Sequence, residues 1–133
     1  MLAVMSTPRR VVYIEDNAAN LALVTKVLGH VGYEVEGATT GEDGLQCIQD
    51  DPPDLVLLDL DLPGIDGFEV VRTIKAIPAF AAIPFIAISA SVMKQERKMA
   101  IDAGCFSFVE KPFDIAELRV AVEEALASAS SQC

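Results

Sequence analysis

The sequence contains few of the residues on which common catalytic and metal-binding sites depend. Its 133 residues include one histidine, His30, and three cysteines without CxxC spacing, Cys47, Cys105 and Cys133. Zinc sites and Ser-His-Asp catalysis therefore lack the side chains that they need. No GxxxxGK(S/T) loop and no glycine-rich dinucleotide fingerprint is present. The odd cysteine count favours a reduced, cytoplasmic setting.

Basic residues are half as frequent as acidic ones. Ten Lys and Arg residues stand against 20 Asp and Glu residues, which gives a net charge of −10. This charge argues against nucleic acid as a direct partner, because phosphates would be repelled, but it suits cations or a basic protein partner. Hydrophobic residues make up 52% of the chain, which is enough for the core of one domain and excludes a disordered chain.

A membrane-spanning segment is not expected either. Ala76–Met93 carries no charge over 18 residues, but Pro78 and Pro84 divide it into pieces too short to span a bilayer. A loop followed by a buried strand is predicted there. In the opening MLAVMSTPRR the charges follow a short apolar run, whereas in a signal peptide they precede it.

Short apolar runs alternate with segments of helical period along the whole chain. Strands are predicted at Val11–Ile14, Tyr33–Ala38, Leu55–Leu58, Phe85–Ser89 and Cys105–Glu110. Helices are predicted at Ala18–His30, Gly41–Gln49, Gly67–Ile77, Val92–Ala103 and Ile115–Ala127. This alternation is typical of an α/β protein with a parallel sheet covered on both faces. Five such units predict an open three-layer sandwich and are too few for an eight-fold barrel.

Polar residues follow the strands at the edge where ligands bind in such folds. Glu15 and Asp16 follow the first strand, Asp59 follows the third, Ser89 ends the fourth and Lys111 follows the fifth. Because the carboxyl ends of parallel strands meet at one edge of the sheet, these five residues are expected to converge.

Three carboxylates at one edge need a compensating charge. Each pair of Glu15, Asp16 and Asp59 at about 4 Å would repel by roughly 4 kcal/mol at an effective dielectric near 20. Mg²⁺ is a hard cation that suits a few carboxylates with positions left open for water or phosphate oxygens. With Lys111 as a phosphate contact and the Ser89 hydroxyl as a donor, the set predicts phosphoryl transfer onto Asp59.

Each of these residues taken singly has a simpler interpretation. Asp16 or Asp66 is equally well explained as a helix N-cap or turn residue. Ser89 alone would be a turn hydroxyl and Lys111 alone a surface residue. His30, near a helix end, is expected to cap or face solvent. The agreement of four strand ends favours the functional interpretation.

The motifs VVYIEDN, LVLLDLDLPGIDGFE, AISAS and FVEKPF together resemble the receiver domain of bacterial two-component response regulators, the CheY-like superfamily. The resemblance runs from Arg10 to Ala127. It implies a flavodoxin-like (βα)5 fold with strand order 2-1-3-4-5. Residues 1–9 are then an N-terminal extension, 10–127 the receiver domain and 128–133 a flexible tail. EDNAANLALV is especially similar to single-domain regulators and to receivers of hybrid kinases.

The resemblance assigns a role to each site residue. Asp59 would be the phospho-acceptor, supplied by a histidine kinase or a histidine phosphotransfer protein. Asp16 and Asp59 would bind Mg²⁺ directly, Glu15 largely through water, and Asp61 through its backbone carbonyl. Ser89 would turn toward the phosphoryl oxygens. The catalytic set on this basis is Asp59, Ser89 and Lys111.

The same resemblance implies a conformational switch. Phe108 occupies the aromatic switch position, and the Lys111-Pro112 bond matches the cis peptide of the family. Phosphorylation would move Ser89 and Phe108 and change the face formed by the fourth helix, fifth strand and fifth helix. Two features depart from the usual pattern: Phe108 lacks a tyrosine hydroxyl, and Asp61 places a carboxylate beside the phosphoryl site.

Output is expected to go through protein contacts, with no attached output domain, to a downstream protein target, with a phosphorylation-dependent dimer as a further option. Leu21, with Ala18, Ala22 and Thr25, is a candidate docking patch for a phosphotransfer helix, although a wide core face explains the same residues. Lys94, Arg97 and Lys98 share one helix face and form either a basic patch for an acidic partner or a solvated surface.

Two rival functions remain open from the sequence. DLDLP resembles the DxD motif of haloacid-dehalogenase-type phosphatases, in which Asp59 would be the nucleophile and Asp61 the acid. In those enzymes, however, the motif belongs on an early strand, and further metal carboxylates follow the lysine. The other rival is a pseudo-receiver, which binds partners without phosphorylation.

Overall fold

The structure is a computed structural model that describes residues 8–90 and 94–130. Within these residues five strands alternate with five helices, as predicted. The strands are β1 (Arg10–Ile14), β2 (Glu34–Ala38), β3 (Leu55–Asp59), β4 (Phe85–Ser89) and β5 (Ser107–Glu110). The helices are α1 (Ala18–His30), α2 (Gly41–Asp50), α3 (Gly67–Lys75), α4 (Lys94–Ala103) and α5 (Ile115–Ser130).

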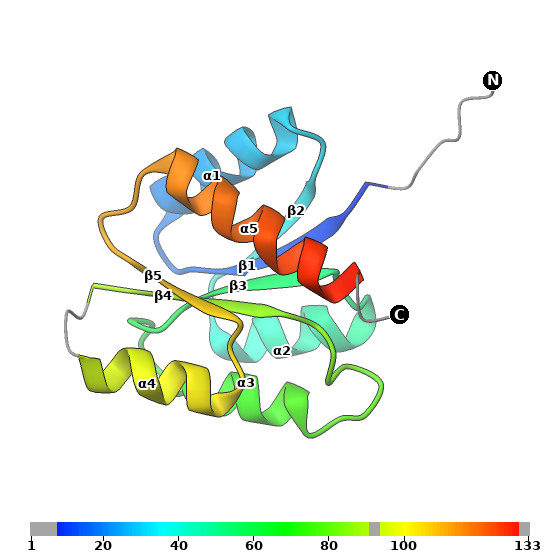
Figure 1. Cartoon of the computed structure of the whole chain (residues 1–133), viewed down its shortest axis with the longest axis vertical. Helices are drawn as coiled ribbons and strands as arrows, with labels where there is room; N and C mark the ends of the chain where they lie inside the picture. Colours follow the sequence, from blue (N-terminus) through cyan, green and yellow to red (C-terminus); the bar gives the residue numbers. More distant parts are fainter. Residues whose placement is uncertain (1–7, 91–93, 131–133) are drawn as a thin grey trace.

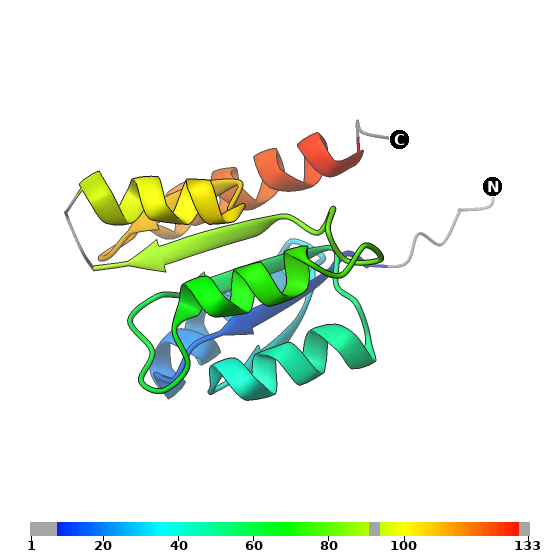
Figure 2. The same ribbon diagram turned by 90° about the horizontal axis from the view of Figure 1, so that it is seen from below.

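All strand pairs are parallel, and the strand order is β2-β1-β3-β4-β5. Helices α1 and α5 cover one face of the sheet, while α2, α3 and α4 cover the other (Figures 1 and 2). The predicted flavodoxin-like three-layer sandwich is therefore confirmed. Among the described residues, no helix combines the length and apolar character needed to cross a membrane.

The sheet is buried on both sides because its central strands β1, β3 and β4 are apolar except for one residue at an end of each. Side chains alternate between two cores: Val12 and Ile14 pack toward α2, α3 and α4, whereas Val11 and Tyr13 pack toward α1 and α5. On the first side α2 lies close to the sheet. A Cβ atom built on Gly44 of α2 would overlap the side chain of Ile14, so a larger residue at this position would force that side chain to shift.

Two strands begin later than their apolar runs, for the same physical reason. β2 begins at Glu34, because Tyr33 closes the end of α1 by donating its backbone N–H to the carbonyl of Leu28. The left-handed Gly32 (φ 98°) makes this closure possible. β5 begins at Ser107, because Cys105 likewise donates to the carbonyl of Ala100 at the end of α4, after the left-handed Gly104 (φ 117°).

The remaining differences are small shifts at the ends of elements. β1 begins at Arg10, one residue before the predicted Val11, and β3 ends at Asp59, one residue after the predicted Leu58. α2 ends at Asp50, one residue after the predicted Gln49. α3 ends at Lys75, two residues before the predicted Ile77, and α5 continues to Ser130, past the predicted Ala127. α4 begins at Lys94, and the first two residues of its predicted range, Val92 and Met93, lie outside the described residues.

Candidate functional site

The predicted strand-end residues lie together at the carboxyl edge of the sheet. Carboxylate oxygens of Glu15, Asp16 and Asp59 all lie within 4.8 Å of one another. Glu15 and Asp59 are each only 1% exposed, whereas Asp16 is open to solvent. Asp16 is not the N-cap of α1, since the adjacent Asn17 has that role. Its carboxylate is therefore available to the cluster rather than used by the helix.

Asp59 is held from two directions. Its Oδ2 accepts a hydrogen bond from Nζ of Lys111 at 2.9 Å, across the sheet from the end of β5. Its Oδ1 accepts one from the backbone N–H of Asp61 at 2.8 Å. Burial opposes the charge of Lys111, but the acidic neighbours Asp59, Glu15 and Asp61 outweigh it and raise the pKa of its ammonium group. Lys111 therefore stays protonated beside Asp59.

Glu15 is oriented by three donors that sequence reasoning did not identify. Its carboxylate accepts from the Tyr13 hydroxyl at 3.0 Å, the Asn17 backbone N–H at 3.2 Å and the Asn20 side-chain amide at 3.3 Å. Burial, followed by the neighbouring Asp59, raises the pKa of Glu15. Burial and the adjacent Glu15 also raise the pKa of the Tyr13 hydroxyl. Glu15 directly follows β1 and lies two residues after Tyr13, so the period of two of an extended chain was the available signal.

The Asp61 side chain makes contacts that the sequence did not specify. Its carboxylate accepts from the backbone N–H of Ala90 at 2.9 Å, from Oγ of Ser89 at 3.2 Å and from Nζ of Lys111 at 3.4 Å. Partial burial opposes the charge of Asp61, but the Ala90 N–H, followed by Lys111, outweighs it and lowers the pKa of the carboxyl. Asp61 is therefore an anion held by three donors.

Both predicted switch residues contact consecutive residues of α4. Ser89 Oγ lies 2.6 Å from Oε1 of Glu96. Phe108, 8% exposed, lies under the guanidinium of Arg97, which is 5.2 Å from the ring centroid and also pairs with Glu110 at 3.7 Å. Neither Glu96 nor this role of Arg97 was expected. The Lys111-Pro112 peptide bond is cis.

Leu21, the central residue of the candidate docking patch on α1, is partly buried in the structure. Leu21 does not stand free on the surface: it packs against the core, with its Cδ2 atom 3.0 Å from the position of a Cβ built on Gly37 of β2. Leu23 is the exposed leucine, at 49%. It lines a pocket of about 410 Å³ together with Asn20, Ala90, Lys111, Pro112 and Phe113.

The candidate basic face of α4 is largely neutralised. Arg97 pairs with Glu110, and Lys98 pairs with Asp102 at 2.8 Å. The side chain of Lys94 lies outside the described part of the chain. His30, the last residue of α1, is exposed, and Asp66 is the N-cap of α3, as their simpler interpretations predicted.

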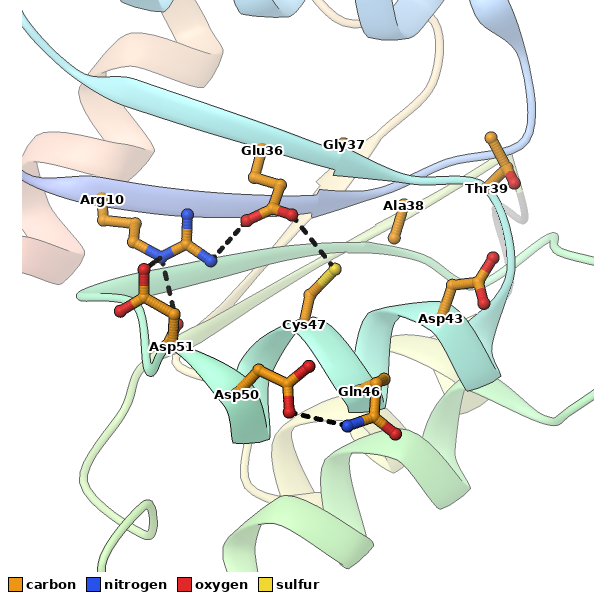
Figure 3. A pocket seen from close by; sticks show the side chains of 10 residues that line it. All are labelled: Arg10, Glu36, Gly37, Ala38, Thr39, Asp43, Gln46, Cys47, Asp50 and Asp51. Carbon is orange, nitrogen blue, oxygen red and sulfur yellow. Dashed lines mark hydrogen bonds and ion pairs between the residues drawn. The ribbon is translucent and has the colours of Figure 1, made fainter.

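A second pocket of about 410 Å³ lies between β2 and α2 (Figure 3). The guanidinium of Arg10 in its wall binds the carboxylates of Glu36 and Asp51. The Cys47 thiol lies 3.5 Å from Glu36. These contacts join β1, β2 and the end of α2, which is a structural role.

Comparison with known proteins identifies the class to which this fold and site belong. Residues 11–123 match the response regulator receiver domain, so the chain belongs to the receiver domain family. It is similar to the polar-differentiation response regulator DivK of Brucella anthropi, with 32% identity over 81% of this chain and 88% of that protein. It is also 32% identical to part of hybrid signal transduction histidine kinase L of Dictyostelium discoideum, covering 86% of this chain and 7% of the kinase.

Solved structures agree with the fold and the family. The CheY-like receiver domain protein of Methanospirillum hungatei has a TM-score of 0.88 and 25% identity, over 96% of this chain and 100% of that one. NtrX of Brucella abortus, solved with ADP, has a TM-score of 0.86 and 28% identity, over 95% of this chain and 29% of its own. This protein is thus a receiver domain of phosphorelay signalling, a class that interacts with histidine kinases or phosphotransfer proteins.

Proposed function

We propose that this protein accepts a phosphoryl group on Asp59 from a histidine kinase or histidine phosphotransfer protein, in a reaction that depends on Mg²⁺. The observation that supports this most directly is the position of Asp59: buried, bonded to Lys111 and grouped with Glu15 and Asp16. A carboxylate in this setting can act as a nucleophile while fixed charges neutralise the transferred group.

The donor set fits Mg²⁺. Around Asp59 the residues Glu15, Asp16 and Asp61 add three further acidic side chains, and Lys111 supplies one compensating positive charge. Asp16, Asp59 and the backbone carbonyl of Asp61 would hold the ion, with Glu15 contributing through water. Bound there, Mg²⁺ would neutralise charge on the carboxylates and on the phosphoryl oxygens.

The transfer is a single displacement at phosphorus. A carboxylate oxygen of Asp59 attacks phosphorus and forms the new P–O bond. The bond from phosphorus to the donor's imidazole nitrogen breaks, and that nitrogen keeps the electron pair. Lys111, the Ser89 hydroxyl and the Ala90 N–H supply donors for the phosphoryl oxygens. Ala90 is an addition that the structure suggests, because its N–H points to the same side as the other two donors.

The signal would leave through α4, β5 and α5. Ser89 is joined to Glu96 and Phe108 is covered by Arg97, so movement of either switch residue changes contacts of α4. We further propose that the donor protein docks at the pocket lined by Leu23 and Phe113, which borders Lys111. Output then occurs by binding a downstream protein or a second copy of the domain.

Incubation with acetyl phosphate and Mg²⁺, followed by intact mass measurement, tests the proposal. Asp59→Asn should abolish the phosphoryl adduct, and EDTA should prevent it in the wild type. Asp43→Asn, which removes one charge from the exposed first turn of α2, should behave as the wild type. Sustained hydrolysis of p-nitrophenyl phosphate would instead support the phosphatase alternative, and no adduct at all would support a pseudo-receiver.

A further inference from the structure

The most unusual feature of the site is that three of its hydrogen-bond donors contact the same acceptor, the carboxylate of Asp61. Ser89 Oγ, the Ala90 N–H and Lys111 Nζ come from the ends of two strands, and all three lie within 3.4 Å of the carboxylate of Asp61. Under the proposed function these are the donors that would receive the phosphoryl oxygens. An anion of this chain therefore already uses the phosphoryl-binding groups.

We propose that the Asp61 carboxylate is a built-in competitor of the phosphoryl group, which must displace it from Ser89, Ala90 and Lys111 when Asp59 is phosphorylated. The inference rests on the proposed function and adds a regulatory role for the Asp61 side chain. A carboxylate suits this role because it carries negative charge and two acceptor oxygens, as a phosphoryl group carries negative charge and three.

The geometry allows the side chain to leave without moving the backbone. The Asp61 side chain is 39% exposed, so rotation can bring its carboxylate into water, where it keeps its hydration. Its backbone N–H remains bonded to Oδ1 of Asp59 at 2.8 Å. Lys111 loses only its longer contact, at 3.4 Å, and keeps its 2.9 Å bond to Asp59.

Competition has a definite consequence for binding. While Asp61 occupies the donors, its charge also repels an incoming anion at short range. The phosphoryl group therefore binds to the fraction of molecules in which Asp61 has turned away, and its apparent affinity is reduced by that fraction. Removing the carboxylate removes both effects.

Beryllofluoride, a mimic of the phosphoryl group, tests this with Mg²⁺ present and without covalent chemistry. Asp61→Ala removes the competitor, and Asp61→Asn removes its charge at nearly constant shape, so the second variant serves if the first folds poorly. Binding is followed by the ¹H–¹⁵N NMR signal of the Ala90 amide. Glu69→Gln on α3 is the matched control, since it removes one charge from a residue that pairs with Arg72.

Both Asp61 variants should reach half-saturation at about three- to tenfold lower beryllofluoride concentration, as expected for loss of one partly exposed competing charge. The Ala90 amide should also shift in the free Asp61→Ala protein, because its acceptor is gone. Unchanged or weaker binding in both variants would overturn the proposal while leaving the proposed function intact. If neither wild type nor variants bind beryllofluoride in an Asp59-dependent way, the proposed function fails, and this inference fails with it.

Discussion

Oγ of Ser89 lies 2.6 Å from Oε1 of Glu96, closer than its 3.2 Å separation from Oδ1 of Asp61. A serine hydroxyl carries one proton, so it can donate to only one of the two carboxylates at a time. The proton therefore alternates between the two carboxylates, and the shorter distance favours donation to Glu96, on α4. The hydroxyl expected to serve the phosphoryl group is thus held by the helix expected to transmit the signal.

Removing Glu96 should therefore release the Ser89 hydroxyl to the site. We expect Glu96→Ala to accelerate phosphorylation by acetyl phosphate about two- to fivefold. This is the rate effect of one hydrogen bond from Ser89 to the charged phosphoryl group, after the loss of hydration is subtracted. The initial rate is read by intact mass. Gln95→Ala, at the adjacent exposed position of α4, is the control and should not change the rate. A slower Glu96→Ala protein would show that this contact assists phosphorylation instead.

The orientation of α1 makes a second prediction, through two leucines of one helix. Leu21 packs on the core beside Gly37, whereas Leu23 is 49% exposed. We expect Leu21→Ala to lower the free energy of unfolding by about 1–2.5 kcal/mol, because contacts and buried area are lost. Leu23→Ala should change it by less than about 0.5 kcal/mol. Urea denaturation measures both, and each variant controls for the helix propensity of the other.

Much of the fold was predictable because its signals are local and strong. The bounds of α1 and β4 agree with their predictions, since an N-cap marks the start of α1 and a run of four apolar residues before Ser89 marks β4. The convergence of Asp59, Ser89 and Lys111 followed from one rule of parallel sheets. In contrast, β2 and β5 begin late, because the first residue of each apolar run closes the preceding helix through a glycine.

The partners of the site side chains could not be predicted in this way. Ser89 and Asp61 are 28 residues apart, and whether the Asp61 carboxylate faces the site or water depends on donors from β4 and β5. Likewise, α1 has apolar residues on several sides, so its sequence leaves open which leucine is buried. The missing side chain of Gly37 on β2 provides the space that Leu21 occupies.

Binding of Mg²⁺ should stabilise the protein in a way that depends on Asp16. At a free Mg²⁺ concentration tenfold above the dissociation constant, the stabilisation is about 1.4 kcal/mol, which raises the melting temperature. In Asp16→Asn, we expect the melting temperature in Mg²⁺ to rise only slightly above its value in EDTA. Asp50→Asn, at the end of α2, should keep the full rise. Sodium chloride at matched ionic strength separates specific binding from screening; an equal response to both salts would contradict a magnesium site.

Cys105 gives a prediction for the alkaline range. Burial raises the pKa of its thiol from 9.0 to about 11, although the nearby Lys75 opposes the shift. Between these values the unfolded chain has lost this proton while the folded chain still holds it. Stability must then fall as pH rises through that window, by roughly 2 kcal/mol from this group. Well below pH 9, where the thiol is protonated in both states, the contribution to the slope vanishes.

The variant Cys105→Ala tests this without interference from other titrating groups. It should be less stable than the wild type near neutral pH by about 1 kcal/mol, because the buried side chain becomes smaller. Its stability should nevertheless fall less steeply between pH 9 and 11. The raised pKa of Tyr13 acts in both proteins, so the difference between the two slopes reports the thiol. Parallel slopes in urea denaturation across this range would show that the thiol is not protected by burial.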